Sequence, residues 1–352
     1  MLVVDHDRPG TDTMSTHALM RGALMQLQRW GLLGELAAQA TPPVKSTSFI
    51  YADGQGDVDI RRSGGIDALR APRRTVLDPV IVAAARRAGA RFEYLTSLRS
   101  VRTDRSGRVC GAVLRNGAGE EQAINSDIVI GADGRRSGLA RLVQAETLEM
   151  SLHASAVAYS YFPGLPDNAY RWYWREGVAA GAIPTNGGMN CVFVAIPSGR
   201  FREMANAIAC EGMSAFARDR VPELAELPGF AQADQPPVLF RGERGHLRRS
   251  VGPGWALVGD AAYFKDPLTA HGISDALRDA EILSRSILAG RVRDYPVMRD
   301  PLCHDFFRIT DRIASFQWDM QDIRELHVQL NREMKAMHAW MDLNFEPARQ
   351  AA

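Results

Sequence analysis

The stretch Trp255-Ala-Leu-Val-Gly-Asp-Ala-Ala262, followed by a loop and by Gly272-Ile-Ser-Asp-Ala-Leu-Arg-Asp-Ala280, decides the fold. Residues 255–258 form a short apolar run typical of a buried strand, and Asp260 follows at its carboxyl end. After the loop, apolar residues recur at helical spacing and predict a helix that ends near Gly290. In open α/β sheets, ligands bind beyond the carboxyl ends of strands, near helix N-termini that favour anions. The stretch therefore indicates a site for a hydroxyl- and phosphate-bearing ligand; the alternative is an ordinary strand–loop–helix connection.

Composition narrows the class of protein. The 352 residues suffice for two domains, and 46% hydrophobic and 24% charged residues are typical of a globular protein. A net charge of +1 argues against nucleic acid as a partner. Four scattered cysteines favour reduced thiols and no metal site, and no apolar run approaches the roughly 18 residues of a membrane span. With no signal peptide evident, we expect a cytoplasmic protein without an integral membrane segment.

Two further acids follow apolar runs. Asp133 stands in Ile130-Gly-Ala-Asp-Gly-Arg-Arg-Ser137, and Asp5 follows the short run Leu2-Val-Val4. One acid at a strand end is weak evidence of a ligand site. Two elaborate motifs together, around Asp133 and Asp260, are much stronger evidence.

These motifs resemble those of the FAD-dependent monooxygenases that share the para-hydroxybenzoate hydroxylase fold, over nearly the whole chain. The resemblance implies that Asp133, with Gly134, lies near the flavin and a reduced nicotinamide (NADH or NADPH). It implies that Asp260, after Gly259, holds a ribityl hydroxyl of FAD. The loop through Pro267 and Gly272 would then run beside the isoalloxazine ring.

The same resemblance covers the N-terminal part of the chain. Arg21 is similar to a family arginine that lies along the cofactor, and Asp5 to the acid that binds the adenosine ribose. The family's Gly-x-Gly-x-x-Gly should precede that acid by about 20 residues, and no glycine pair in this chain completes it. The fingerprint is therefore expected upstream of Met1. Either the start is set too late, which we favour, or the chain has lost its first strand and pyrophosphate loop.

The flavin loop departs from the family at Ala270, where many relatives have glycine. The adjacent His271 is the candidate catalytic residue, because a histidine there could bond flavin or substrate and titrate near neutral pH; the alternative is a solvent-facing side chain. His17 is a second such histidine. The cluster Tyr170-Arg-Trp-Tyr-Trp174 invites comparison with flavin-dependent halogenases, but its spacing to Ile183-Pro184 does not match their motif. It favours a sheet face or a pocket wall instead.

We therefore expect an α/β protein: a Rossmann-like FAD-binding domain, N-terminally truncated, with an inserted β-rich substrate domain and a helical C-terminal tail. The expected boundaries are 1–50, 72–147 and 248–300 for the FAD-binding domain, 51–71 and 148–247 for the substrate domain, and 301–352 for the tail. Expected helices begin at Ser15 or Thr16 and at Asp78, with Pro79 in first position, and cover 203–220 and 304–345.

The expected function is that of an FAD-dependent oxidoreductase. The leading interpretation is a monooxygenase that uses reduced nicotinamide and O₂ on an apolar, small organic substrate. The alternatives are a flavin-dependent reductase of isoprenoid double bonds and a non-catalytic chain that lost its pyrophosphate loop. The cofactor supplies the chemistry in either enzyme, which explains why no catalytic triad, metal cluster or carboxylate pair is evident in the sequence.

Overall fold

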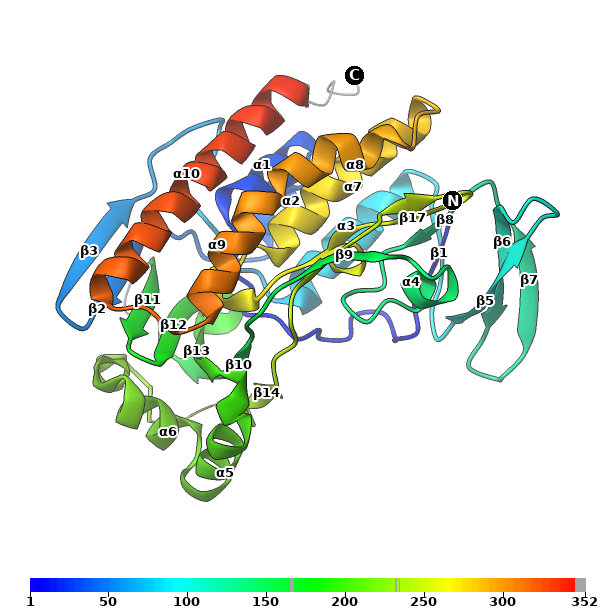
Figure 1. Ribbon diagram of the computed structural model, residues 1–352. Coiled ribbons are helices and arrows are strands. Elements are labelled where there is room, and N and C mark those ends of the chain that lie inside the picture. Colours follow the sequence, from blue (N-terminus) through cyan, green and yellow to red (C-terminus); the bar gives the residue numbers. More distant parts are fainter. Residues whose placement is uncertain (165–167, 232, 234, 346–352) are drawn as a thin grey trace.

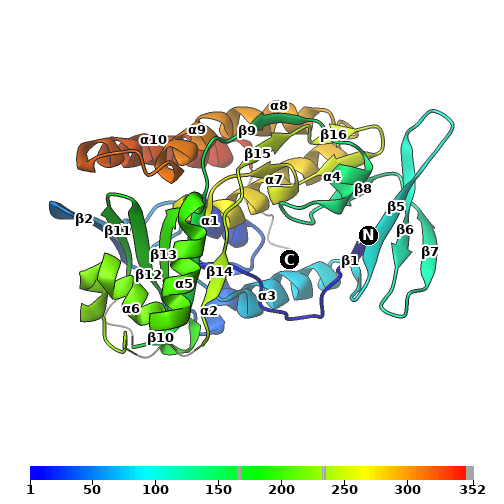
Figure 2. The same cartoon turned by 60° about the horizontal axis from the view of Figure 1, so that its bottom comes forward.

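A seven-stranded sheet stands between two groups of helices in the computed structural model, which describes residues 1–164, 168–231, 233 and 235–345. Helices α9 and α10 cover one side of this sheet, and α5 and α6 cover the other (Figure 1). Smaller sheets and the helix α7 extend away from it, and the sheet β5–β7 projects at the far end (Figure 2).

The helices and strands have the following bounds. The helices are α1 Arg21–Arg29, α2 Leu33–Ala38, α3 Arg74–Arg87, α4 Gly138–Leu142, α5 Phe201–Glu211, α6 Met213–Arg220, α7 Gly272–Leu288, α8 Asp294–Arg299, α9 His304–Ala314 and α10 Met320–Asn344. The strands are β1 Leu2–Val4, β2 Ser46–Tyr51, β3 Gly54–Asp59, β4 Arg91–Glu93, β5 Ser97–Thr103, β6 Val109–Arg115, β7 Glu121–Asn125, β8 Val129–Gly131, β9 Thr147–Met150, β10 Ser155–Pro163, β11 Ala169–Arg175, β12 Val178–Thr185, β13 Met189–Pro197, β14 Val238–Phe240, β15 His246–Arg248, β16 Val251–Gly252, β17 Trp255–Leu257 and β18 Tyr263–Phe264.

The large sheet runs in the order β14-β10-β13-β12-β11-β2-β3, and only its β2–β11 pair is parallel. Because side chains alternate between faces, Tyr159, Trp172 and Phe193 lie on the face toward α9 and α10. The opposite face is lined by smaller residues such as Ala156 and Ala158, which pack with α5 and α6. Tyr170, Trp172 and Trp174 of the predicted cluster therefore form one wall of the main core, whereas Tyr173 lies on the opposite face.

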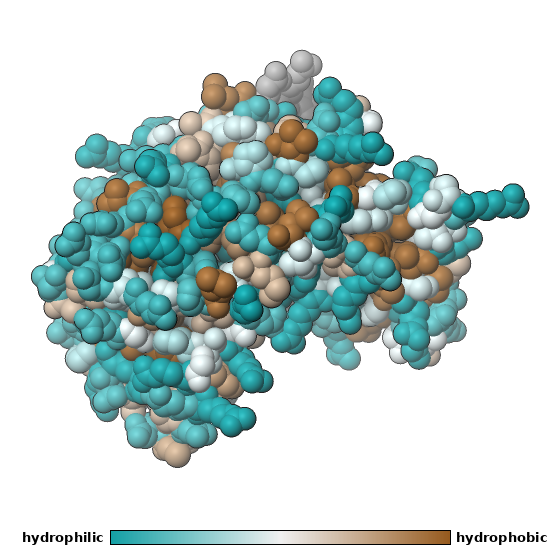
Figure 3. Space-filling view, in the orientation of Figure 1, coloured by the Kyte–Doolittle hydropathy of each residue, from teal (hydrophilic) through white to brown (hydrophobic). Residues whose placement is uncertain are grey.

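The parallel strands that carry the acidic motifs occur in two separate pieces. β1 pairs in parallel with β4, and β8 pairs in parallel with β17. Both views place β1 near β8 (Figures 1 and 2), yet within the described ranges no backbone ladder joins them. Parallel strands are usually covered on both faces, but Ile130 of β8 is 38% exposed. In the space-filling view, hydrophobic residues gather in small groups, one of them near β8 and α4 (Figure 3).

Several expected element boundaries are wrong. The helix expected from Ser15 begins at Arg21, because the Ser15 hydroxyl accepts from the His17 backbone in an irregular loop instead of capping a helix. The helix expected at Asp78 begins at Arg74, and Asp78 pairs with Arg74 inside it rather than capping it. The expected helices 203–220 and 304–345 are each broken, at Gly212 (φ 85°) and at residues 315–319.

The mixed α/β architecture agrees with the expectation, while the division into domains stays a prediction. Its expected boundary at residue 50 falls inside β2, whose six residues all pair with β3. Among the described helices, none combines the length and the apolar character that crossing a bilayer requires.

Candidate flavin site

The Gly-Asp motif turns the chain from β17 toward the N-terminus of α7. Gly259 adopts φ 59°, which favours glycine, and an added Cβ would lie only 3.2 Å from the Cβ of Ala276 in α7. A Cβ at Gly272, the first residue of α7, would lie 3.9 Å from Oδ1 of Asp260. The Asp260 carboxylate therefore faces the helix N-terminus, where backbone N–H groups favour anions.

Asp260 is ready to accept hydrogen bonds. Burial raises the pKa of its carboxyl, and the ammonium of Lys265 opposes this rise. In the described part of the chain, no side-chain or backbone donor bonds the carboxylate, whereas its backbone carbonyl lies 3.1 Å from Nε2 of His246. A partly buried acceptor to which no described donor bonds suits a ligand hydroxyl.

The loop between β18 and α7 is held at both ends by buried carboxylates. Asp266 accepts from the backbone and the hydroxyl of Ser155 on β10, at 2.6 and 2.7 Å, and from the backbone of Leu268 at 3.1 Å. Asp275, in the first turn of α7, contacts the buried ammonium of Lys265. These contacts leave Pro267 exposed at the tip of the loop.

Ala270 adopts φ 54° in this loop, a left-handed conformation that glycine reaches without strain. The departure from the family's glycine, noted in the sequence, thus falls at a position where the backbone favours glycine.

His271 points into the core instead of toward solvent. It is 2% exposed, and its ring packs on Phe306 of α9 with centroids 4.6 Å apart. Its Nδ1 contacts the carbonyl oxygen of Thr269, and because a carbonyl only accepts, Nδ1 carries the proton. Burial lowers the pKa of the ring to about 3. The expectation that His271 titrates near neutral pH is therefore wrong, because the imidazolium is costly in this enclosed position. Its catalytic role stays a prediction.

A network of buried charged side chains packs against the loop between β18 and α7. Arg278 donates to Asp275 at 3.0 Å and to Asp279 at 2.7 Å, and all three side chains are at least 95% buried. Lys265 extends the chain and lies over the rings of Tyr263 and Phe306. This network was not predicted, although the spacing of Asp275, Arg278 and Asp279 was a signal that the three charges lie close together on α7.

The Asp133 motif stands beside the Gly-Asp motif, because β8 and β17 are parallel neighbours. Asp133 itself caps α4: it accepts from the Ser137 hydroxyl at 2.5 Å and from the backbone of Gly138 at 2.7 Å. Gly134 adopts φ 74° in the turn before that helix. The structure thus gives Asp133 a capping role, and contact with the cofactor stays a prediction.

Arg248 joins the two motifs and was not found from the sequence. It donates to the carbonyl of Ala261 at 2.9 Å and to that of Arg135 at 3.3 Å. Its strand, β15, carries no recognisable motif, so only the three-dimensional arrangement identifies it.

The two N-terminal candidates, Asp5 and Arg21, make their hydrogen bonds with residues outside the motifs around Asp133 and Asp260. Asp5, exposed at the end of β1, accepts from the backbone of Asp7 at 2.9 Å. Arg21 donates to the carbonyls of Arg61, Ser63 and Ile66 at 2.7–3.1 Å, so its guanidinium holds that loop. Their contacts with a cofactor stay predictions.

A narrow hollow separates the flavin loop from the aromatic face of the large sheet. It is lined by Thr16, Val157, Trp172, Phe193, Pro267 and Leu268. Its open space is about 10 Å³, room for about one water molecule. A ring-sized ligand can therefore enter only when side chains or the loop move.

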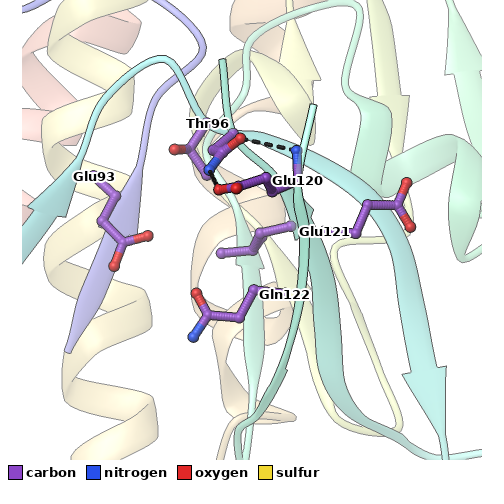
Figure 4. A pocket seen from close by; sticks show the side chains of 7 residues that line it. Glu93, Thr96, Glu120, Glu121 and Gln122 are labelled. Carbon is purple, nitrogen blue, oxygen red and sulfur yellow. Dashed lines mark hydrogen bonds between the residues drawn. The ribbon is translucent and has the colours of Figure 1, made fainter. Parts of the chain in front are cut away.

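A larger groove of about 350 Å³ lies elsewhere, between β4 and the sheet β5–β7 (Figure 4). Glu93, Glu120 and Glu121 line it, and Glu120 accepts from the Asn116 amide at 2.8 Å. None of the predicted site residues borders this acidic groove, and carboxylates do not suit an apolar substrate. The smaller hollow beside Pro267 is the better candidate for the site of an apolar substrate.

Comparison with known proteins decides the family. Residues 1–194 match the family model described as FAD binding domain, which is more than half of the chain. The chain belongs to this FAD-binding family. It is therefore an FAD-dependent enzyme of the monooxygenase and oxidoreductase type, and the expected fold class is confirmed.

Individual relatives of this FAD-binding protein are distant. A menaquinone reductase from Mycolicibacterium smegmatis is 26% identical over 315 residues, which cover 84% of this chain and 72% of that protein. The flavin-dependent brominase Bmp2 has a TM-score of 0.77 at 18% identity, covering 97% of this chain and 86% of that one. PqsL, a probable FAD-dependent monooxygenase from Pseudomonas aeruginosa, has a TM-score of 0.72 at 16% identity, covering 95% and 92%. At such identities the structural likeness shows the fold alone.

Proposed function

We propose that the protein is a monooxygenase that uses reduced nicotinamide and O₂ to oxygenate a planar, largely apolar organic molecule. The observation that carries the proposal is the hollow between the flavin loop and the sheet, lined mainly by apolar residues, among them the rings of Trp172 and Phe193. Aromatic and aliphatic walls bind flat apolar molecules and exclude water. FAD, when bound, supplies hydride acceptance and oxygen activation.

The riboflavin half of FAD fits the residues present. The Asp260 carboxylate is partly buried, receives no hydrogen bond from a donor of the described chain, and faces the first turn of α7. We assign it to a ribityl hydroxyl. Gly272 is the first residue of α7 and has no side chain that could block access to the helix N-terminus. Pro267 and Leu268 line the hollow, so the loop lies at its edge.

The chain's own residues shape the rest of the site. Leu268, Trp172 and Phe193 keep the hollow dry, which strengthens polar interactions inside it. His271 lies behind the loop as a neutral ring whose Nε2 is a buried acceptor without a partner in the described chain. We propose that it supports the loop rather than transferring a proton at neutral pH.

A reductase is the second candidate, favoured by one observation. The relative from Mycolicibacterium smegmatis, which matches over most of this chain, is named a menaquinone reductase. A reductase would use the same flavin loop and hollow, with the organic molecule as the final acceptor in place of O₂.

Two measurements on the FAD-loaded protein separate the candidates. With NADPH or NADH, 1-naphthol and isotopically labelled O₂, a monooxygenase incorporates labelled oxygen into product. Under nitrogen, a reductase oxidises the nicotinamide in proportion to added 2-methyl-1,4-naphthoquinone. Substrate-dependent nicotinamide oxidation that needs no oxygen and leaves no label in the product would reject the monooxygenase.

A further inference from the structure

His17 and Tyr161 form a buried polar pair at the edge of an otherwise apolar wall. Nε2 of His17 contacts the Tyr161 hydroxyl, and the two rings stack with centroids 5.7 Å apart. His17 is 1% exposed and Tyr161 is 3% exposed. The Arg73 guanidinium also lies 4.0 Å from the centroid of the Tyr161 ring, and it pairs with Asp12 at 2.6 Å.

The backbone of His17 is strained. It adopts φ 67°, a left-handed conformation that residues with a side chain seldom adopt. Hydrogen bonds hold it there: the His17 backbone donates to the Ser15 hydroxyl at 2.9 Å, and the Ser15 backbone donates to the Tyr159 hydroxyl at 3.3 Å. Strain that the surrounding structure maintains is concentrated at functional sites. The loop is thus fixed on the sheet so that an imidazole is buried.

The loop that carries His17 borders the hollow beside the flavin loop. Thr16, which precedes His17, lines that hollow together with Phe193 and Trp172. Tyr159 pairs with Phe193 across β10 and β13, and Tyr161 is the next residue along β10 on the same face. On β12, Gly181 has no side chain, and a Cβ there would overlap the Phe193 ring. The polar pair therefore stands at one end of a wall whose remaining surface is apolar.

One ring nitrogen of His17 has no partner. Nδ1 is buried and makes no hydrogen bond in the described part of the chain. Burial lowers the pKa of this ring to about 4, so it is neutral at physiological pH. If Tyr161 donates to Nε2, then Nδ1 carries a proton and is an unused donor. A buried donor without an acceptor costs free energy, unless a ligand supplies the acceptor.

We propose that His17, oriented by Tyr161, binds an oxygen substituent on the ring of the substrate. The ligand class is a planar aromatic or quinoid ring that carries a phenolic or carbonyl oxygen. The inference rests on the proposed function, because it places the ring in the hollow beside Pro267 and Leu268. A charged group on the ring is disfavoured, since the imidazole is neutral and the hollow offers no buried counter-charge among its lining residues.

The test compares two probes that differ by one oxygen, 1-naphthol and naphthalene. Their binding to the FAD-loaded protein is measured by equilibrium dialysis without nicotinamide. We expect 1-naphthol to bind at least about tenfold more tightly, because a buried polar group rejects the analogue that leaves it unpaired. His17→Asn tolerates the left-handed backbone but shortens the side chain. It should reduce the ratio of the two affinities to about one and change naphthalene binding less than about twofold.

Two further variants keep the test interpretable. Tyr161→Phe removes only the hydroxyl that orients His17, and we expect an intermediate ratio. His327→Asn is the matched control, because His327 is a partly buried histidine whose Nδ1 bonds a tyrosine hydroxyl, that of Tyr51 at 2.8 Å, and it does not line the hollow. We expect the wild-type ratio there.

Equal binding of both probes by the wild type, or a ratio that survives His17→Asn, would overturn the inference. Failure of the proposed function looks different. Equilibrium dialysis requires no turnover, so the ratio of the two affinities can be measured even on a protein whose flavin is not reduced by nicotinamide. Such a protein would contradict the proposed function, while the affinity ratio would still support or overturn the role of His17.

Discussion

At the residue scale, the Asp260 carboxylate faces the N-terminus of α7 and is partly buried. We expect Asp260→Ala to weaken FAD binding by about 1.5–3 kcal/mol, the usual contribution of a hydrogen bond to a charged group. The measurement is the FAD dissociation constant from flavin fluorescence. Asp260→Asn, which keeps the size of the side chain, serves as the control for packing. An unchanged affinity in the alanine variant would reject the assignment of Asp260 to the ribityl chain.

His271 gives a second residue-scale prediction. Since burial lowers the pKa of its ring to about 3 and Nδ1 contacts a carbonyl, the ring keeps one charge state from pH 6 to 8. We expect His271→Gln to leave the shape of the pH profile of flavin reduction unchanged over that range. The profile is measured by anaerobic stopped-flow mixing with NADPH. An ionisation near pH 6.5 that disappears in the variant would show that the histidine titrates after all.

At the element scale, the flavin loop is closed by the buried pair of Lys265 and Asp275. We expect Lys265→Met to reduce the free energy of unfolding by about 3–5 kcal/mol, because it leaves the Asp275 carboxylate with less compensation. The double variant Lys265→Met with Asp275→Leu should recover much of this loss, since the under-compensated Asp275 carboxylate is gone and Arg278 still pairs with Asp279. Urea unfolding at pH 7 measures both. If the double variant were as unstable as the single one, the Lys265–Asp275 pair would contribute stability beyond the neutralisation of its two charges.

The same scale shows what the sequence could and could not predict. The strands around both acidic motifs and the hairpins of β5–β7 were predictable, because apolar runs and turn residues mark them locally. β12 was missed, since Val178-Ala-Ala-Gly-Ala-Ile-Pro-Thr185 has few residues that favour strands. It forms because β11 and β13 pair on both sides and because Gly181 leaves room for Phe193. The inward turn of His271 was likewise unpredictable, because Phe306 lies 35 positions further along the chain.

At the scale of the whole molecule, the separation of the β1–β4 pair from the β8–β17 pair predicts how FAD affinity can be increased. A segment placed before Met1 that forms a parallel strand between β1 and β8, continues into Gly-x-Gly-x-x-Gly and returns to β1 through a crossover helix would add a pyrophosphate site near Asp5. We expect tighter FAD binding than by residues 1–352 alone. The control segment replaces the three glycines with alanine. Equal FAD affinity of the two extended proteins would contradict the expectation.

Five histidines, three of them buried and two partly buried, make the whole molecule sensitive to acid. Burial lowers the pKa of His17, His246 and His338 to about 4, and that of His271 and His327 to about 3. Below pH 6.5 the imidazoles are protonated in the unfolded chain but stay neutral in the folded protein. The free energy of unfolding therefore decreases as the pH falls toward the folded pKa values. At pH 5 each ring costs about 2 kcal/mol. Together they approach the total stability of a typical domain, about 5–15 kcal/mol.

Asp266 has the opposite effect on the pH dependence of stability, and its replacement serves as the control. Burial raises the pKa of its carboxyl to about 6, so its folded form gains about 1 kcal/mol of relative stability between pH 7 and pH 5. This gain is smaller than the histidine cost, and we expect urea midpoints to fall steeply from pH 7 to pH 5. His327→Phe should make that fall shallower, because one proton acceptor of the unfolded chain is gone, whereas Asp266→Asn should make it steeper. A pH dependence that His327→Phe leaves unaltered would show that this ring is protonated equally in the folded and unfolded states.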